Sequence, residues 1–234
     1  MLKKHSKSCS NWRPARQRNS VRFLAFGMLA LLVSGKAVAV DEDVSTIPQR
    51  IGSGDPVAGR ETSESERCQE CHGQDGNSDD GRIPSHAGQY AGYLIKQLRD
   101  FQSGARKHPV MSVIAEDLSE ADMADIAAYF ASQKRRQDSS AGGNAAAGNL
   151  FSNGDQARAI DACANCHGEG GKGRSADSVT YPAIGGQHKT YLSGQLVNWK
   201  LGERANSPGG VMNRIAKALT DDEIEALSAY LSGL

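Results

Sequence analysis

Apolar residues recur at helical spacing in three stretches of each half of the chain. The first stretches, near residues 56–70 and 145–165, lead into pairs of cysteines. The second stretches carry apolar residues at positions i, i+4 and i+7, which places them on one helix face. These residues are Leu94, Leu98 and Phe101 in the first half, and Leu192, Leu196 and Trp199 in the second.

The third stretches begin with helix-capping patterns. Ser119-x-x-Asp122 is a weaker form of the capping box, and Thr220-x-x-Glu223 is the full form. One apolar stripe follows each cap, and no strand-like alternation competes with it. The pattern therefore predicts an all-α fold. The stripes consist of Met123, Ile126, Ala127 and Phe130 in the first half, and of Ile224, Leu227 and Leu231 in the second.

An internal duplication underlies this symmetry. The hexapeptide CQECHG at 68–73 recurs as CANCHG 95 positions later. The segments 84–104 and 111–129 recur at offsets of 98 and 101. Because the offset grows in two steps of three, the insertions lie in loops between constant elements. The duplication predicts two tandem domains of roughly 95 residues, a size at which a bound apolar cofactor helps to fill the core.

A short linker separates the two copies. The segment 137–147 reads QDSSAGGNAAA and has no apolar periodicity, as is typical of a flexible connection. We therefore place an N-terminal domain at residues 40–138 and a C-terminal domain at residues 139–234.

Residues 1–39 have the features of a secretory signal peptide. They contain eight basic residues and no acidic one, then an apolar run at 21–33 and the small-residue pattern Ala37-Val38-Ala39. We expect cleavage near Ala39/Val40 and export to the periplasm. The alternative is an uncleaved membrane anchor, but the apolar run is shorter than the roughly 20 residues of a spanning helix.

The chain without its first 39 residues is acidic, with 19 basic and 27 acidic residues. This net negative charge does not favour nucleic acid as a partner. The net charge is −7 over residues 40–138 and −1 over residues 139–234. A solvated acidic surface that keeps the protein soluble is the commoner explanation of such an imbalance. The functional alternative is a dipole that directs a basic partner to the N-terminal domain.

Four cysteines remain when cleavage removes Cys9, and each Cys-x-x-Cys pair is followed directly by histidine. Disulfides are an option in an exported protein. A thioredoxin-like pair requires a βαβ context, and a zinc site does not require histidine at the next position. Two thiols three positions apart on a helical turn can instead add to the two vinyl groups of one haem. The motif therefore predicts two covalently bound haem c groups, held by Cys68, Cys71, Cys163 and Cys166, with His72 and His167 as proximal iron ligands.

The sixth iron ligand has to come from another part of each copy. Met111 and Met212 occupy the same repeat position before the final helix, whereas Met123 lies on an apolar stripe and fits the core. We therefore expect Met111 and Met212 as axial ligands, with His86 and His108 as alternatives in the first domain. His/Met ligation raises the haem potential relative to bis-His ligation. It also leaves no open position for a substrate, which favours electron transfer over catalysis.

These residues together resemble the cytochrome c4 family, the dihaem class I cytochromes of bacterial periplasms. The resemblance extends over the whole mature chain. It rests on both Cys-x-x-Cys-His-Gly motifs, on the segment from Ala87 to Arg106 and its second copy, on both repeated methionines, and on Leu118-Ser119-x-x-Asp122 running into Ala128-Tyr129.

The resemblance implies two tandem class I cytochrome c domains that carry electrons in a respiratory chain and catalyse no reaction. Its implied partners are a quinol-oxidising complex and a terminal oxidase or other acceptor, with loose membrane association. We expect a monomer.

The resemblance also implies roles for prolines and glycines. The carbonyls of Pro84 and Pro182 would accept a hydrogen bond from the proximal histidines, which orients the imidazole rings. Gly59 and Gly148 would let the first helix of each domain approach the third, near Tyr129 and Tyr230. The sequence departs from the family where an apolar residue usually precedes Ala/Gly-Gly-Gln: Ile184 keeps that pattern, but His86 breaks it.

Two other functions remain to be weighed. One is the cytochrome subunit of a multi-subunit periplasmic dehydrogenase, which would use the same two domains. The other is a dihaem peroxidase, which needs one haem with an exchangeable site. The matched methionines and the short chain argue against the peroxidase.

Overall fold

The computed structural model describes residues 52–136, 143–176 and 179–234, which all lie within one compact unit of the chain. The predicted signal peptide, its cleavage site and the predicted domain boundary at 138/139 lie outside these residues. In the described part, no helix has both the length and the apolar character needed to cross a membrane. Below, the N-terminal half means residues 52–136 and the C-terminal half means residues 143–234.

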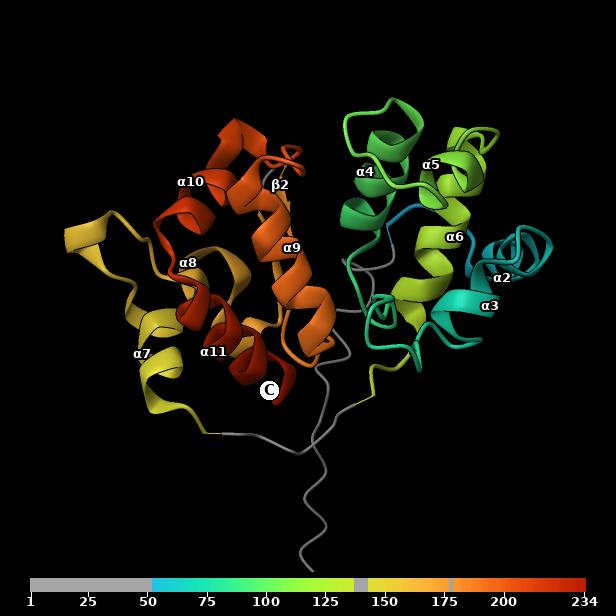
Figure 1. Cartoon of the computed structure of the whole chain (residues 1–234). Helices are drawn as coiled ribbons and strands as arrows, with labels where there is room; N and C mark the ends of the chain where they lie inside the picture. The colour runs from blue at the N-terminus through green and yellow to red at the C-terminus, as the bar shows by residue number, and fades with distance from the viewer. Residues whose placement is uncertain (1–51, 137–142, 177–178) are drawn as a thin grey trace, which may run out of the picture. The chain divides into compact units, whose positions relative to one another are not determined.

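The N-terminal half is helical throughout its regular elements. Helix α6 packs against both α2 and α4, so it forms the centre of this half (Figure 1). The short helix α3 follows α2 directly and carries the first cysteine pair. The helices are α2 (Pro56–Ser65), α3 (Cys68–His72), α4 (Ala91–Gln102), α5 (Met111–Ile114) and α6 (Glu120–Ser132).

The C-terminal half repeats this order of helices. Helix α9 packs against α10 and α11, and α7 packs against α8 and α11. The helices are α7 (Ala145–Asn153), α8 (Cys163–His167), α9 (Lys189–Leu201), α10 (Val211–Ala218) and α11 (Asp221–Ser232). Three 3-10 turns accompany them: η2 (Gln156–Arg158), η3 (Glu169–Gly171) and η4 (Pro208–Gly210).

A small hairpin and one isolated bridge between Asp155 and Ile160 depart from the predicted all-helical pattern in the described residues. Strand β1 (Arg174–Ala176) pairs antiparallel with β2 (Val179–Tyr181), with Arg174 opposite Tyr181. The hairpin lies where the repeat offset first grows by three, between the cysteine motif and the following proline. The longer loop satisfies its backbone hydrogen bonds by pairing with itself. The protein is therefore mainly helical, as predicted.

Each half has its own hydrophobic core, built from the predicted stripes. In the N-terminal half the side chains of Met123, Ile126 and Phe130 are buried. Met123 is 0% exposed, which confirms its interpretation as a core residue. In the C-terminal half Ile224, Leu227 and Leu231 join the second core, as predicted.

Both predicted capping boxes are complete. Ser119 Oγ accepts from the Asp122 backbone N–H at 3.1 Å, and the Asp122 carboxylate accepts from the Ser119 N–H at 3.0 Å. Thr220 and Glu223 make the same exchange at 3.2 and 2.9 Å. The Asp122 box is thus as complete as the Glu223 box, because the shorter side chain still reaches the N-cap amide.

Two glycines let the first helix of each half approach the third. A Cβ on Gly59 would lie 1.8 Å from the Asp125 carbonyl oxygen, and one on Gly148 would lie 3.2 Å from Tyr230 Cε2. The expectation for Gly148 and Tyr230 is confirmed. The close approach of the first helix to the third at Gly59 is confirmed too, and the nearest atoms belong to Asp125, one helical turn before Tyr129 on α6.

We expect Gly59→Ala to lower the free energy of unfolding by about 3 kcal/mol, because the new methyl group meets rigid backbone of α6. Gly194→Ala on α9 is the matched control, since its Cβ meets nothing within 4 Å. A helical glycine with room for a methyl group gains about 0.5–1 kcal/mol of stability on replacement by alanine. Chemical denaturation of the haem-loaded protein measures both. Equal effects of the two substitutions would contradict the close helix contact.

Candidate haem-binding sites

Each cysteine motif forms one short helix that ends at its histidine. Helix α3 places His72 in a buried position, and α8 does the same for His167. His72 Nδ1 lies 2.9 Å from the Pro84 carbonyl oxygen, and His167 Nδ1 lies 2.8 Å from the Pro182 carbonyl oxygen. A carbonyl only accepts, so Nδ1 carries the proton and Nε2 is left as a metal ligand. The proline contacts implied by the resemblance are therefore present in both halves.

Burial shifts the pKa values of the histidine and the first cysteine of each motif. Burial lowers the pKa of His72 and of His167, which favours the neutral imidazole that binds metal. Burial raises the pKa of the Cys68 thiol to about 11, and that of Cys163 likewise to about 11.

Disulfide and zinc chemistry find no support in the geometry. The four cysteines of the two motifs are free thiols. Among the described residues, no three His, Cys, Asp or Glu side chains gather in a way that would hold a metal ion. The two pairs lie on the separate short helices α3 and α8, each ending at its own histidine, as a haem at each motif requires.

The local backbone conformation requires glycine directly after each proximal histidine. Gly73 and Gly168 have φ values of +83° and +75°, a region that other residues rarely adopt. A Cβ on Gly73 would lie 2.3 Å from the Asn77 carbonyl oxygen. The chain turns away from the helix here and then passes back under the histidine to its proline.

The two repeated methionines occupy equivalent places in the fold. Met111 is the first residue of α5, and Met212 is the second residue of α10. Both side chains are half-buried. Met212 and His167 line one cavity, so the structure brings these two predicted ligands together. Most of its wall comes from the C-terminal half, and Pro84, His86 and Tyr93 add wall from the N-terminal half. Pro182, Ile184, Leu192 and Leu196 supply apolar wall to the same cavity.

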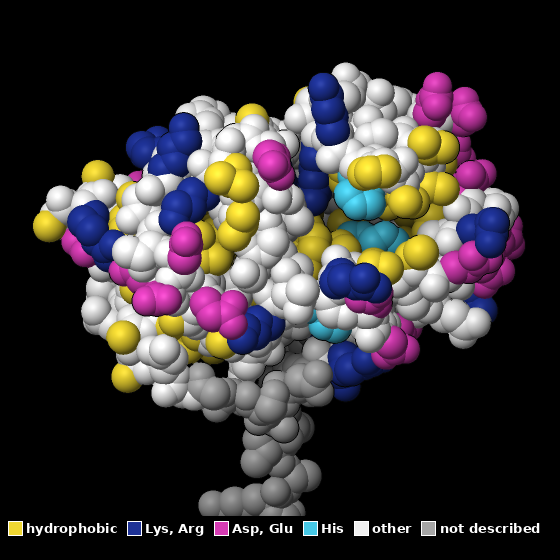
Figure 2. All heavy atoms as spheres, viewed as in Figure 1, with side chains coloured by type: hydrophobic (Ala, Val, Ile, Leu, Met, Phe, Trp, Pro, Cys, Tyr) yellow, Lys and Arg dark blue, Asp and Glu magenta, His cyan; other side chains and the backbone are white. Residues whose placement is uncertain are grey.

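His86 lies against the proximal histidine of the first site. Its ring centroid is 4.1 Å from that of His72 and 5.7 Å from that of Phe130. An iron ion bound between two imidazoles, each about 2 Å from the metal, would hold their centroids roughly 6 Å apart. The observed stacking is too close for His86 to bind the iron opposite His72. Figure 2 shows histidine side chains surrounded by hydrophobic ones in the half drawn at the right.

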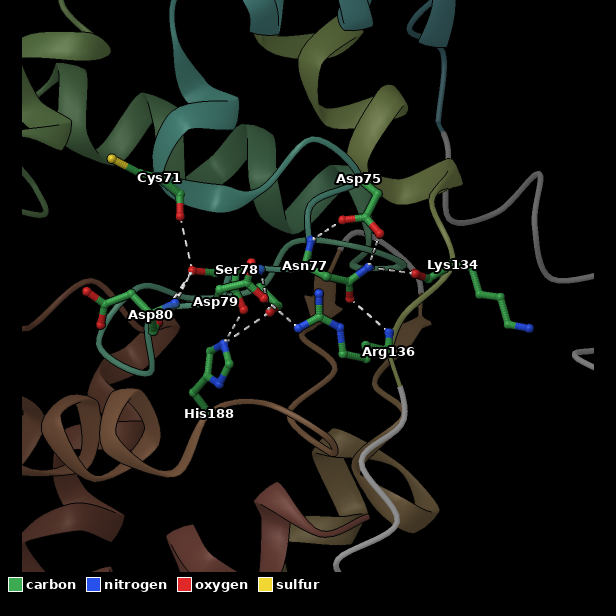
Figure 3. Close-up of polar contacts among 10 residues, drawn as sticks. Cys71, Asp75, Asn77, Ser78, Asp79, Asp80, Lys134, Arg136 and His188 are labelled. Atoms are coloured by element: carbon green, nitrogen blue, oxygen red, sulfur yellow. Dashed lines mark hydrogen bonds and ion pairs between the residues drawn. The ribbon is translucent and has the colours of Figure 1, made fainter.

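His108 and His188 have other contacts. His108 Nδ1 accepts hydrogen bonds from the backbone N–H groups of Val110 and Met111, both at 3.3 Å. His188 Nε2 lies 3.0 Å from the Ser78 carbonyl oxygen, and Ser78 Oγ in turn donates to the Cys71 carbonyl at 3.0 Å (Figure 3). His188 therefore braces the loop after the first cysteine motif and does not face an iron site.

Two buried donors test whether the C-terminal cavity fits a haem. Trp199 Nε1 lines this cavity and is buried without a hydrogen-bond partner in the structure. The Arg204 side chain also lines it, is 5% exposed, and donates only to neutral oxygens, of Gln97, Gln195, Tyr93 and Asn206. A buried cation needs an anionic partner, and an indole N–H needs an acceptor. The propionate carboxylates of a haem supply both, so the residues fit the group.

Sequence reasoning did not single out this arginine pair as functional. Arg106 and Arg204 stand at the repeat offset of 98, and each donates to a glutamine of its own half at 2.8 Å. Arg106 also reaches Gln195 at 2.9 Å, and Arg204 reaches Gln97 at 3.0 Å. The repeat alignment itself carries the signal, because both copies have arginine at this position. Arg204 is buried and Arg106 is half-buried.

A bound haem supplies reversible one-electron chemistry at its iron. The chain contributes the two thiols that hold it, the oriented imidazole, an apolar wall and buried donors for its carboxylates.

Known cytochromes are similar to this chain over most of its length. The family model for cytochrome c matches residues 57–134 and 151–234. Cytochrome c4 from Pseudomonas aeruginosa is 39% identical over 184 residues, which cover 78% of this chain and 90% of that protein. The thiosulfate dehydrogenase electron acceptor of Stutzerimonas stutzeri is 36% identical over 224 residues, covering 92% and 96% of the two chains.

A solved structure matches as well. The crystal structure of reduced recombinant cytochrome c4 from Pseudomonas stutzeri superposes with a TM-score of 0.70 at 36% identity, and covers 78% of this chain and all of its own. Two matched domains, each with its Cys-x-x-Cys-His motif, account for two haem c groups. The chain belongs to the cytochrome c4 family of dihaem c-type electron carriers.

Proposed function

We propose that this protein is a periplasmic electron shuttle in which each haem iron has one histidine and one methionine as axial ligands. Its donor is a quinol-oxidising complex, and its acceptor is a terminal oxidase or another oxidising partner. The single observation that carries the proposal is the cavity lined by both His167 and Met212, with the Pro182 carbonyl orienting the histidine. Two strong axial ligands leave no position for a substrate.

The first haem is assigned the same ligands by the repeat. His72 has the same proline contact as His167, and Met111 begins the helix that corresponds to α10. The stacking of His86 on His72 argues against His86 as the opposite ligand. His108 is the alternative to Met111 as sixth ligand of the first haem iron, because His108 Nε2 makes no hydrogen bond in the described part of the structure.

A second candidate function is that of electron acceptor for a dehydrogenase. Two relatives carry the name thiosulfate dehydrogenase electron acceptor, one from Stutzerimonas stutzeri and one from Thiomonas intermedia. The structure of a thiosulfate dehydrogenase from Marichromatium purpuratum aligns with 76% of this chain, but only 40% of that chain is matched. The TM-score is 0.65 and the identity 35%.

The two candidates predict different partners. Affinity purification of the tagged, haem-loaded protein from its native periplasm identifies a stably bound dehydrogenase if the second candidate is right. A free shuttle elutes alone and is reduced rapidly by membranes supplied with quinol. Mass spectrometry of the same material tests export, because we expect a mature chain that begins at Val40.

The charge imbalance gives a further prediction. We expect reduction by a basic redox protein to slow steeply as the salt concentration rises, because the charges of residues 40–138 are screened within about 10 Å at 0.1 M salt. Stopped-flow absorbance measures the rate. The control is a small neutral reductant, whose rate should be insensitive to salt. A rate for the basic protein that is equally insensitive would leave only the solubility explanation of the acidic surface.

A further inference from the structure

Two glutamines at equivalent repeat positions each bind the backbone of the opposite half. Gln187 Oε1 accepts from the Ser85 N–H at 3.0 Å, and its Nε2 donates to the Ser85 carbonyl at 2.9 Å. Gln89 Oε1 accepts from the Ala183 N–H at 2.9 Å, and its Nε2 donates to the Ala183 carbonyl at 2.8 Å. Each side-chain amide therefore pairs with both polar backbone groups of one residue, in a reciprocal arrangement.

The residues that these glutamines hold directly follow the two critical prolines. The Ser85 N–H belongs to the same peptide group as the Pro84 carbonyl, which accepts from His72 Nδ1. The Ala183 N–H belongs to the same peptide group as the Pro182 carbonyl, which accepts from His167 Nδ1. One continuous hydrogen-bonded path therefore runs from each proximal imidazole, through one peptide group, to a glutamine of the other half.

A peptide group that donates through its N–H is polarised, and its carbonyl becomes a stronger acceptor. A stronger acceptor at Nδ1 makes the imidazole more basic and more electron-donating toward a metal on Nε2. Electron donation favours the oxidised iron, so it lowers the reduction potential of that haem.

We propose that Gln187 and Gln89 are positioning residues that act across the two halves, each lowering the potential of the haem in the opposite half. Gln187 thereby acts on the haem of the N-terminal half, and Gln89 on the haem of the C-terminal half. The inference rests on the proposed axial role of His72 and His167. The reduction potentials of the two haems then depend on the hydrogen bonds between the two halves.

The test is a redox titration of the haem-loaded protein, followed by NMR so that the two haems are resolved. We expect Gln187→Leu to raise the potential of the N-terminal haem more than that of the C-terminal haem, and Gln89→Leu to do the reverse. The Nδ1 proton resonance of the proximal histidine opposite each substituted glutamine should move upfield, as expected for a weaker hydrogen bond. Gln187→Glu keeps an acceptor for the Ser85 N–H, so the N-terminal potential should stay at or below its original value.

His188→Leu is the matched control. It removes the adjacent contacts of His188 Nε2 with the Ser78 carbonyl at 3.0 Å and with Ser85 Oγ at 3.4 Å. It leaves the hydrogen bonds from both glutamines to the backbone of Ser85 and Ala183 in place. We expect no haem-selective shift from it. The proposal would be overturned if each glutamine variant shifted the potentials of both haems equally. It would also be overturned by a larger shift in the half that carries the substitution, or by no shift.

The same spectra separate this proposal from the proposed ligation. If the unmodified protein lacks a proximal Nδ1 proton resonance for His72 and His167, the axial assignment itself is wrong. If both resonances are present but the shifts do not cross between the halves, only the role of the glutamines fails.

Discussion

A Cys68→Ala, Cys71→Ala double variant is expected to carry one covalent haem per chain where the unmodified protein carries two. Thioether bonds survive denaturation, so the haem that remains belongs to Cys163 and Cys166. The two motifs are on separate short helices in halves with separate cores. We therefore expect the loss to be confined to the substituted half. Mass spectrometry of denatured protein, made with haem-attachment machinery, counts the haems.

The matched control is Cys9→Ala, which we expect to leave both haems in place. Cys9 is outside both motifs and within the predicted signal peptide. The reciprocal Cys163→Ala, Cys166→Ala variant should keep only the N-terminal haem. Two retained haems in either double variant would rule out attachment through that motif. A complete loss of haem in both would show that the halves do not take up haem independently.

A Met212→His variant should lower the potential of one haem by on the order of 0.1 V, a modest part of the roughly 0.8 V that axial ligands span. Histidine in place of methionine stabilises the oxidised iron. The absorption band diagnostic of iron–methionine bonding should fall by about half, since the other haem keeps its ligand. Met111→His should act in the same way on the N-terminal haem. Redox titration followed by absorbance measures both effects.

Met123→Leu is the control for this pair. Met123 is fully buried in the N-terminal core, so the change should cost less than about 1.5 kcal/mol of stability and leave both potentials unchanged. If the band keeps its full intensity in Met111→His, then Met111 is not the ligand. His108 becomes the candidate, and His108→Ala should then change the N-terminal potential.

The sequence determined the helical architecture because its signals are local. A stripe of apolar residues at helical spacing and a capping box at Thr220 specify a helix whatever surrounds them. The repeat specified two units, and the cysteine motifs specified two haems. The hairpin of β1 and β2 was missed, since a three-residue strand has too short a pattern to detect.

The candidate sites could be predicted only in part. The proximal histidines follow from their motif, and the paired methionines follow from the repeat. The approach of Gly59 to the third helix could be predicted, but not that Asp125 lies nearest, because the register between α2 and α6 depends on packing along both helices. His86 could be named as a departure, but only the fold shows that its ring lies on His72.

The sequence by itself determined which residues carry the chemistry of this protein, because covalent attachment depends on a short contiguous motif. Only the tertiary structure decided how the two halves influence each other. Gln89 and Ala183 are 94 positions apart, and Gln187 and Ser85 are 102 apart, yet each pair makes two hydrogen bonds. A directional hydrogen bond between distant residues forms only when both segments of backbone are in place, so no local pattern in the sequence indicates it.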